Sequence, residues 1–485
     1  MPRHRSRILE VLHRAEVGPI IEEADFERRL VAPAIKRTIQ KYEIKMDRNI
    51  PVPSDNDLAD RVFQAGLDLA VEIGMFCQST SRRITWTHAE LEEGIRFCPG
   101  ETIMGAGNDA VICRARVPED SSPPVIIGGA YGVPFPENLF VPVMLSFAKE
   151  SVIDVIENAT LETVYGYPIK AGSPWEVLGG WREAELSMEV VNRAGRPGLC
   201  IGCVETSPTA LAQLSAASWG GFRTTDWHHV ATISEFKTNY DLLSKVAHIT
   251  RIGGVMECYY NPIYGGYVGG AEGVAVAIVA ALVLLNQIDM ADTIATRPNH
   301  PFLGCDTTPE LLWAMSVALQ GLSRNTNLLV GALTGPAGGP GTKTMLYENA
   351  AFTIATTVSG QSMIEASHSA GGNVPRHVSG LDAKICGEVA YAIRGMSREH
   401  ANDLVKRLIA IYESQLNNQP IGKPFEEVYD IETIQPTSEW QGMYDEVRSE
   451  LIKMGLPLDR LACEPVRGKE LYENREMNPE TLSIE

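Results

Sequence analysis

Short apolar runs ending in glycine alternate with longer helical stretches from about residue 125 onward, and this alternation constrains the fold more than any other feature of the chain. The runs include VIIGG (125–129), GLCIG (198–202) and NLLVGAL (327–333). Each run is followed by a segment whose apolar residues are three and four positions apart, as in an amphipathic helix. Alternating strands and helices favour a parallel sheet with helical crossovers.

About eight strand–helix units fit between residues 125 and 397, close to the ~250 residues typical of a (β/α)8 barrel. The other expected strands are VIDVIEN, VATIS, GVMECYY, MADTIAT and a short one near 363–367. An open doubly wound sheet is the alternative, and it would favour GxGxxG after the first strand. Neither GAGND nor GGAYG has that spacing. We therefore expect an α/β fold, with a (β/α)8 TIM barrel as the catalytic domain over 125–397.

The segments on either side of the barrel have other patterns. Residues 1–124 predict an N-terminal extension, with helices over 7–14, 22–42 and 55–76 and a small hairpin in TIMGAGNDAVICRARV. Asp55 or Asp57 is the expected N-cap of the third helix, and Thr87 with Glu90 has the spacing of a capping box. Residues 398–485 read as C-terminal helices and an acidic tail.

Charge and cysteine usage restrict the class of protein. With 42 basic and 61 acidic residues the formal net charge is −19, which disfavours binding to nucleic acid or to anionic membranes. The most apolar run, 273–285, is shorter than the ~20 residues of a spanning helix, so we expect a buried helix. The N-terminus lacks the apolar region of a signal peptide, and the nine scattered cysteines suit reduced thiols. A cytoplasmic protein is predicted.

Functional groups of a barrel gather where its strands end, so we searched the segments that follow the expected strands. These segments, together with TTDWHHV around the fourth unit, hold carboxylates, histidines and tyrosines: Glu205, Asp226, His228, His229, Tyr259, Tyr260, Tyr264, Glu365 and His368. Glu205 is either a functional carboxylate or an anchor for the next helix. Of two adjacent histidines on a strand, at most one faces the site. The tyrosines either box a cation or pack beneath a loop.

A metal site is only partly indicated. Cys200 and Cys203 form one CxxC fragment, and no second CxxC or HxxxH completes four ligands. Cys258, His229 or Cys305 could join the pair in space. The expectation is that no metal is bound, with zinc left open.

Five longer segments resemble the monomethylamine:corrinoid protein methyltransferase family, and the resemblance covers about 15–457. They are GRPGLCIGCVETSPTALAQLSA, TTDWHHVATISEFKTNYDLLSKVAH, NPIYGGYVGGAEG, GKPFEEVYDIETIQPTSEW and AELEEGIRFCPGETIMGAGNDAV. The resemblance implies a barrel, a homohexamer and methyl transfer from a methylated amine to the Co(I) of a corrinoid. It also implies that a separate small protein carries the corrinoid, so that no cofactor is bound directly.

The chain departs from the family where its substrate is held. By resemblance, Gly202 stands at the position of the family's pyrrolysine, and Glu205 matches a family glutamate. His229 and Tyr259 replace two acidic residues, and Leu333 replaces a glutamine. The resemblance therefore implies a branch without pyrrolysine. Glu205 and His229 are the expected catalytic residues; the expected substrate-binding residues are Gly202, Asp226, His228, Tyr259, Tyr260, Tyr264 and Leu333.

The function expected from these observations is methyl transfer from a small N-methylated compound to a corrinoid protein. The donor is a methylamine, an N-methyl amino acid or a quaternary ammonium. Two alternatives stay open. One is a zinc-dependent methyltransferase or lyase that uses Cys200, Cys203 and either Cys258 or a histidine. The other is a non-catalytic paralogue that only binds the corrinoid protein.

Overall fold

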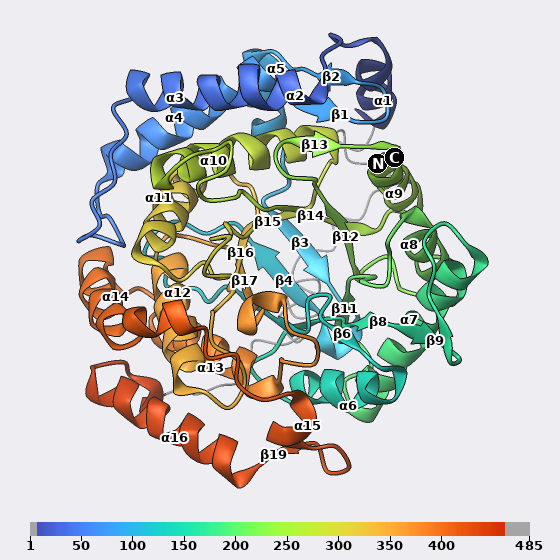
Figure 1. Cartoon of the computed structure of the whole chain (residues 1–485), viewed down its shortest axis with the longest axis vertical. Coiled ribbons are helices and arrows are strands. Elements are labelled where there is room, and N and C mark those ends of the chain that lie inside the picture. The colour runs from blue at the N-terminus through green and yellow to red at the C-terminus, as the bar shows by residue number, and fades with distance from the viewer. Residues whose placement is uncertain (1–6, 461–485) are drawn as a thin grey trace, which may run out of the picture.

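Eight parallel strands form a closed barrel in this computed structural model, which describes residues 7–460 (Figure 1). In chain order they are β5 (Val125–Gly129), β7 (Val155–Glu157), β11 (Cys200–Gly202), β12 (Trp227–Ala231), β14 (Val255–Tyr260), β15 (Thr293–Thr296), β16 (Val330–Leu333) and β17 (Met363–Ala366). Each strand pairs with the next, and β17 pairs with β5 to close the ring. The predicted TIM barrel is confirmed, and the open sheet is excluded.

A ring of helices surrounds the strands (Figure 1). They are α6 (Glu137–Ala148), α7 (Pro174–Arg193), α8 (Ala210–Ala216), α9 (Tyr240–Ile252), α10 (Ala271–Ile288), α11 (Pro309–Asn325), α12 (Lys343–Thr357) and α13 (Gly380–Ala392). By length and composition α10 could cross a membrane, but 94% of it is buried within the described structure, against α11 and the N-terminal extension. The prediction of a buried core helix is confirmed.

One strand lies elsewhere than the sequence predicted. The expected strand VATIS began at residue 230, whereas β12 runs from Trp227 to Ala231. One face of β12 is buried and the other is partly buried, and His228 and His229 lie on opposite faces. A histidine on each face interrupts the apolar pattern that marks a strand in the sequence, so the N-terminal half of β12 was not recognised.

The N-terminal extension shares its core with the barrel (Figure 1). It contains α1 (Ile8–Val17), α2 (Glu23–Asp25), η2 (Phe26–Val31), α3 (Ala32–Lys41), α4 (Asn56–Ile73), β1 (Met75–Cys77), β2 (Arg82–Ile84) and α5 (His88–Arg96). Helix α4 packs on α10 and α11, and β1 pairs with β13 (Lys237–Thr238) from the barrel. Of the two candidate caps, Asp55 is the N-cap of α4, because its Oδ1 accepts from the N–H of Leu58 at 3.1 Å. The Thr87–Glu90 capping box is also present.

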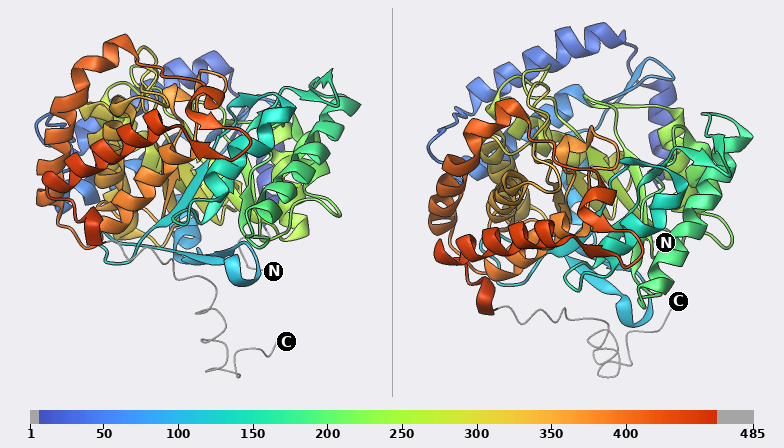
Figure 2. Two further views of the ribbon diagram at one scale, coloured as in Figure 1. Left: turned by 90° about the horizontal axis from the view of Figure 1, so that it is seen from below. Right: turned by 60° about the horizontal axis from the view of Figure 1, so that its bottom comes forward.

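The predicted hairpin consists of β3 (Glu101–Met104) and β4 (Val111–Arg114), and it closes the N-terminal end of the barrel (Figure 2). Met104 and Cys113 belong to the same buried cluster as the inward-facing side chains of the strands. The backbone N–H groups of Gly105 and Ala106 donate to the carbonyls of Thr225 and Gly198, both at 2.8 Å. The opposite end, where the strands terminate, is called the mouth below.

The C-terminal segment covers the barrel helices on one side. Helices α14 (Arg398–Tyr412) and α16 (Ser438–Lys453) pack on α12. The short elements between and after them are η5 (Glu413–Asn418), α15 (Phe425–Val428), β18 (Tyr429–Asp430), β19 (Gln435–Pro436) and η6 (Leu458–Arg460). The predicted tail, with Cys463, lies outside the described residues, and the domain boundaries at 124 and 397 stay predictions. The eight cysteines within the described range are all free, as expected.

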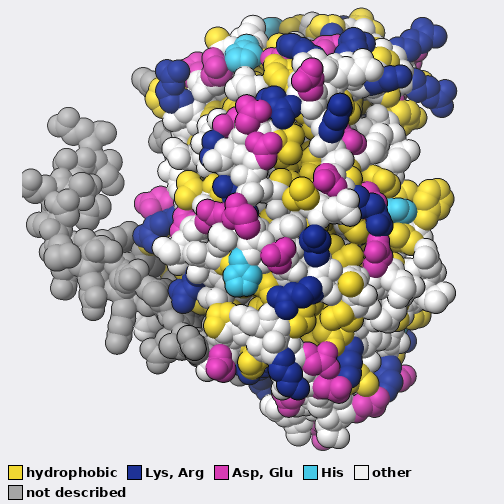
Figure 3. Space-filling model, turned by 90° about the vertical axis from the view of Figure 1, so that its left-hand side faces the viewer, with side chains coloured by type: hydrophobic (Ala, Val, Ile, Leu, Met, Phe, Trp, Pro, Cys, Tyr) yellow, Lys and Arg dark blue, Asp and Glu magenta, His cyan; other side chains and the backbone are white. Residues whose placement is uncertain are grey.

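The negative charge is not gathered on the side of the molecule shown in Figure 3. Acidic, basic and hydrophobic side chains are interspersed there. This face therefore presents no extended area of a single sign to a charged partner.

Candidate active site

Four carboxylic side chains meet at the mouth. Glu157 and Glu365 are buried near the C-terminal ends of β7 and β17, Glu257 is buried in the middle of β14, and Glu205 joins them from the segment after β11. Glu205 was a predicted catalytic residue and Glu365 a noted candidate, whereas Glu157 and Glu257 were missed. A signal for them exists in the sequence: each of the three strands carries a glutamate directly after two apolar residues, VIE, VME and MIE. A charge inside such an apolar run marks an inward-facing functional group.

Burial and mutual repulsion disfavour the ionised form of these groups. The pKa values of Glu157, Glu257 and Glu365 are raised well above their ordinary range, first by burial and then by the negative charge of the neighbouring carboxylates. Glu157 also shares a hydrogen bond with Glu205, which raises its pKa further. A cation bound among them would allow them to ionise. The site is therefore suited to a positively charged occupant.

His229 faces one of these carboxyl groups. Its Nδ1 is paired with Oε2 of Glu257. Burial lowers the pKa of His229 to about 4, whereas burial and the nearby charge of Glu205 raise the pKa of Glu257. The ring of Tyr259 lies 5.6 Å from the imidazole, centroid to centroid. Because Nδ1 is turned to Glu257, the opposite nitrogen of His229 is left for a ligand.

The loop that carries Glu205 is fixed from behind by α7. The backbone N–H groups of Glu205 and Thr206 donate to the carboxylate of Glu183 at 2.9 Å each. Burial raises the pKa of Glu183 to about 8. On the other side, Gly132 has a φ of +75°, and a Cβ there would lie 2.6 Å from Oε2 of Glu205. Glycine at residue 132 thus lets the backbone approach the carboxylate closely.

Gly202 does not leave an open space. It faces the barrel interior beside Trp227 in the neighbouring strand, and a Cβ at residue 202 would lie 2.7 Å from Cε3 of that indole. Trp227 is fully buried, and its Nε1 donates to Oγ1 of Thr293 at 2.8 Å. Tryptophan therefore occupies the volume that a side chain at residue 202 would need.

The structure brings only one of the predicted tyrosines into the site. Tyr259 faces the interior, as does the predicted Leu333, which pairs in register with Glu365. Tyr260 faces outward and packs on Phe236, with ring centroids 5.2 Å apart. Tyr264 stacks on His300 in a half-buried loop. The tyrosines therefore do not form a box around one cation.

Asp226 and His228 also lie away from the mouth. Asp226 precedes β12 at the closed end of the barrel, where its carboxylate accepts from the backbone N–H and side chain of Arg223. His228 faces the surrounding helices, with Nε2 2.9 Å from the carbonyl oxygen of Arg223. As expected for two adjacent histidines on a strand, only one of them, His229, faces the site.

A buried cationic network lies at the ends of β15 and β17. The guanidinium of Arg297 is 3.2 Å from Oδ2 of Asp306 and 2.9 Å from Nδ1 of His368. Burial and the positive charge of Arg297 hold the pKa of His368 well below its usual range, so this histidine is a neutral acceptor. The network places an arginine–aspartate ion pair beside His368 at one side of the mouth, which sequence spacing did not reveal.

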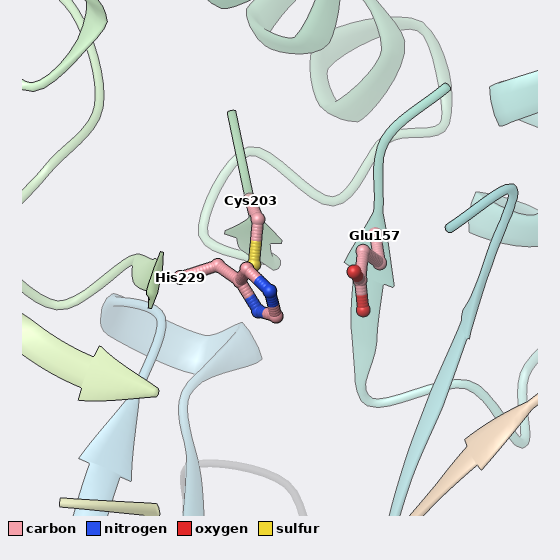
Figure 4. A group of neighbouring side chains, drawn as sticks. All are labelled: Glu157, Cys203 and His229. Carbon is pink, nitrogen blue, oxygen red and sulfur yellow. The ribbon is translucent and has the colours of Figure 1, made fainter. Parts of the chain in front are cut away.

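Three side chains at the mouth have the chemistry of metal ligands. One ligand atom each from Glu157, Cys203 and His229 lie within 4.8 Å of one another, and Figure 4 shows the three side chains directed toward one region of the interior. Cys200 and Cys258, the other two cysteines of the zinc-dependent alternative, do not join this group. Sγ of Cys200 donates to the carbonyl of Thr225 at the closed end, and Cys258 faces outward toward Asp289.

Comparison with known proteins places this arrangement in a family. The model of the family "Monomethylamine methyltransferase MtmB" matches residues 6–456. Monomethylamine methyltransferase MtmB2 of Methanosarcina acetivorans is 33% identical over 443 residues, which cover 91% of this chain and 96% of the relative. MtmB of Methanosarcina mazei is likewise 33% identical with the same coverage.

Two solved structures have the same fold. The crystal structure of the monomethylamine methyltransferase of Methanosarcina barkeri superposes with a TM-score of 0.90 at 32% identity, covering 93% of this chain and 98% of that one. A complex of MtmB with hydroxylamine gives the same values. The similarity therefore extends over the barrel and both flanking segments.

Proposed function

The chain belongs to the monomethylamine methyltransferase family, and from that premise we propose that it moves a methyl group from a small N-methylated compound to the Co(I) of a corrinoid protein. Membership makes the chain a methyltransferase. The corrinoid, carried by a separate small protein, supplies a strongly nucleophilic metal that accepts the methyl group. The chain itself would bind the donor, orient its methyl group toward the mouth and hold the proton that the leaving amine needs.

The observation that carries the proposal is the set of four carboxyl groups to which Glu205 belongs. A methylated ammonium brings one positive charge into a site where three buried carboxyl groups have raised pKa values, so its binding is favoured by their ionisation. Tyr259 supplies one aromatic face beside this charge. Such an electrostatic site would need no pyrrolysine, and the close packing of Trp227 on Gly202 supports a branch of the family without it.

We assign the proton of the leaving amine to the carboxyl groups. A pKa of about 4 leaves His229 uncharged at neutral pH, so it does not act as an imidazolium acid. Burial and the charge of Glu205 raise the pKa of Glu257, which favours this carboxyl group as the source of the proton. His229 positions Glu257 through its Nδ1, and the charge of Glu205 acts on Glu157, Glu257 and Glu365.

Three further features are proposed from the resemblance to the family, the first of them with support from the structure. We propose that the corrinoid protein docks over the mouth, because the other end of the barrel is closed by the β3–β4 hairpin. We also propose a homohexamer and a cytoplasmic location.

The test is a methyl-transfer assay with the full-length protein and a corrinoid protein reduced to Co(I). We expect the absorbance of methyl-Co(III) with at least one donor from a panel of methylamines, N-methyl amino acids and betaines. Replacing the acid, Glu205→Gln, should lower the rate by about 10²–10⁴-fold. The matched control is Glu189→Gln, an exposed glutamate of α7 paired with Arg193, which should keep the wild-type rate. The proposal would be overturned if no donor gave methyl-Co(III) although the cobalt of the corrinoid protein was shown to be Co(I).

A further inference from the structure

We propose that Glu157, Cys203 and His229 bind a zinc ion at the mouth of the barrel, with one coordination position left open for the heteroatom of the methyl donor. The metal site itself is independent of the proposed methyl transfer, and only the role of the open position rests on it. A carboxylate, a thiolate and an imidazole are each established zinc ligands, and three protein ligands with an open fourth position are typical of a catalytic rather than a structural zinc site.

The fold brings the three ligands together because their strands are neighbours. Glu157 ends β7, Cys203 follows β11 directly and His229 lies in β12, and these three strands are adjacent in the barrel. Their ligand atoms lie within 4.8 Å of one another (Figure 4). Zinc–ligand bonds of ~2.0–2.3 Å place tetrahedral ligand atoms about 3.5 Å apart. Rotations of the side chains that move the ligand atoms by about 1 Å would therefore close the group around an ion.

The surroundings of the ligands match what an ion requires. Oε2 of Glu157 is buried and has no hydrogen-bond partner among the described residues, so one acceptor is directed into the site unused. Nδ1 of His229 faces Glu257, which leaves Nε2 for the metal. A carboxylate behind a ligating histidine is a common outer-shell arrangement, because it fixes the ring and strengthens the imidazole as a ligand.

Charge also favours a cation at this point. The Cys203 thiol has four carboxyl groups around it, those of Glu157, Glu205, Glu257 and Glu365. The buried ammonium of Lys245 on α9 interacts with both Cys203 and Glu205. One divalent ion would stabilise the thiolate and the carboxylates together. The sulfur ligand selects zinc over magnesium or calcium, which prefer oxygen.

The proposed ion restricts the methyl donor, on the assumption that the proposed function holds. A donor must offer a lone pair to the open position, which primary and secondary methylamines do once deprotonated and quaternary ammonium compounds do not. In the transfer, the lone pair of Co(I) forms a bond to the methyl carbon and the carbon–nitrogen bond breaks. Its electron pair would stay on the zinc-bound nitrogen as an amide, the cobalt would become methyl-Co(III), and a carboxyl proton of the site would convert the amide to the released amine.

Metal binding can be measured on the full chain without any corrinoid protein. The protein, treated with a chelator and then titrated with ZnCl₂ against a chromophoric competitor, should bind one equivalent. X-ray absorption should show one sulfur and otherwise nitrogen or oxygen ligands. With Co²⁺ in place of zinc, a thiolate-to-metal charge-transfer band should appear, a readout that needs no variant.

Variants then assign the ligands. Cys203→Ala, His229→Ala and Glu157→Ala should each weaken zinc binding by more than the ~10–100-fold that loss of an outer-shell partner costs. Cys200→Ala and Cys258→Ala are the matched controls, because both are buried barrel cysteines outside the group, and they should bind zinc as the wild type does. Absence of stoichiometric zinc and of the cobalt band in the wild type would overturn the inference, as would full binding by Cys203→Ala. Methyl transfer by protein shown to be free of metal would reject the zinc site and leave the proposed function standing.

Discussion

The indole of Trp227 lies directly against the backbone of Gly202, so closely that a β-carbon at residue 202 would come within 2.7 Å of Cε3 and 3.0 Å of the tryptophan Cβ. The two residues pair in register on neighbouring strands, and both face the barrel interior. The size of the side chain at position 202 is therefore coupled to the size of the side chain at position 227. The absence of a side chain at position 202 is matched by a bulky one beside it.

This coupling predicts the outcome of a small substitution. Gly202→Ala should destabilise the protein by about 1–3 kcal/mol, because the fully buried indole has little room to move. Adding Trp227→Leu should recover part of that loss, giving a coupling free energy between the two sites. Urea unfolding of the two single variants and the double variant measures it. Purely additive effects would show that the residues do not compete for the same space.

Substitutions of Tyr259 and Tyr264 should differ sharply in their effect on the KM for the methyl donor. Tyr259→Ala should raise KM by about 2–30-fold, the equivalent of one cation–π contact of about 0.5–2 kcal/mol. Tyr259→Phe keeps the aromatic face and should leave KM near the wild-type value. Tyr264 stacks on His300 outside the site, so Tyr264→Ala should not change KM. A rise in KM for both alanine variants would restore the tyrosine box that the structure does not form.

Glu257 should act on the metal through His229. Glu257→Gln keeps the size of the side chain but removes the carboxylate behind the imidazole, so zinc affinity should fall by about 10–100-fold. Chelator competition measures the change. The comparison variant is Glu365→Gln, which removes another acid of the same mouth that does not pair with His229, and its effect on zinc affinity should be smaller. Equal effects would mean that only the net charge of the mouth matters.

The pKa of Glu183 gives a pH dependence of stability. Burial raises it to about 8, above the ordinary value of about 4.3, so the native state holds a proton that the unfolded state releases. This contribution is fully present below the ordinary pKa and is lost as pH rises to about 8, with a slope of at most about 1.4 kcal/mol per pH unit.

Glu183→Gln removes this titration while every other ionisable group is kept. The free energy of unfolding of the wild type should therefore fall relative to that of the variant between pH 5 and pH 8, within the window of about 4.3–8 set by the two pKa values. At pH 5 the variant should be the less stable protein, because its amide cannot accept from both Glu205 and Thr206 as the carboxyl does. Parallel pH profiles from urea unfolding would contradict the assignment.

The architecture was predictable because the residues of each strand–helix unit indicate that unit by themselves, without contacts to distant parts of the chain. Runs such as NLLVGAL and GLCIG indicate their own strands, and Thr87 with Glu90 indicates its own helix start. The barrel then follows from the number and order of the units. The start of β12 was not predictable, because His228 and His229 break the apolar pattern on both of its faces.

The site was predictable only in part, because it depends on contacts between strands. Glu205 and His229 could be selected since each stands near a strand end. Nothing in the spacing of residues 157, 203 and 229 indicates a ligand group, because the three meet only when β7, β11 and β12 lie side by side. Likewise, alternation along a strand separates Tyr259 from Tyr260, but only the closed barrel shows that Tyr259 is the one inside.

The hairpin that closes the N-terminal end of the barrel would set the order of events in the proposed catalytic cycle. Met104 and Cys113 pack into the interior from that end, so donor and cobalt would both reach the site through the mouth. A corrinoid protein seated on that entrance would block it, so the donor must enter first and the demethylated product must wait until the corrinoid protein departs. Kinetics should therefore be of the compulsory-order type, with the corrinoid protein inhibiting at high concentration by trapping the enzyme before the donor has bound.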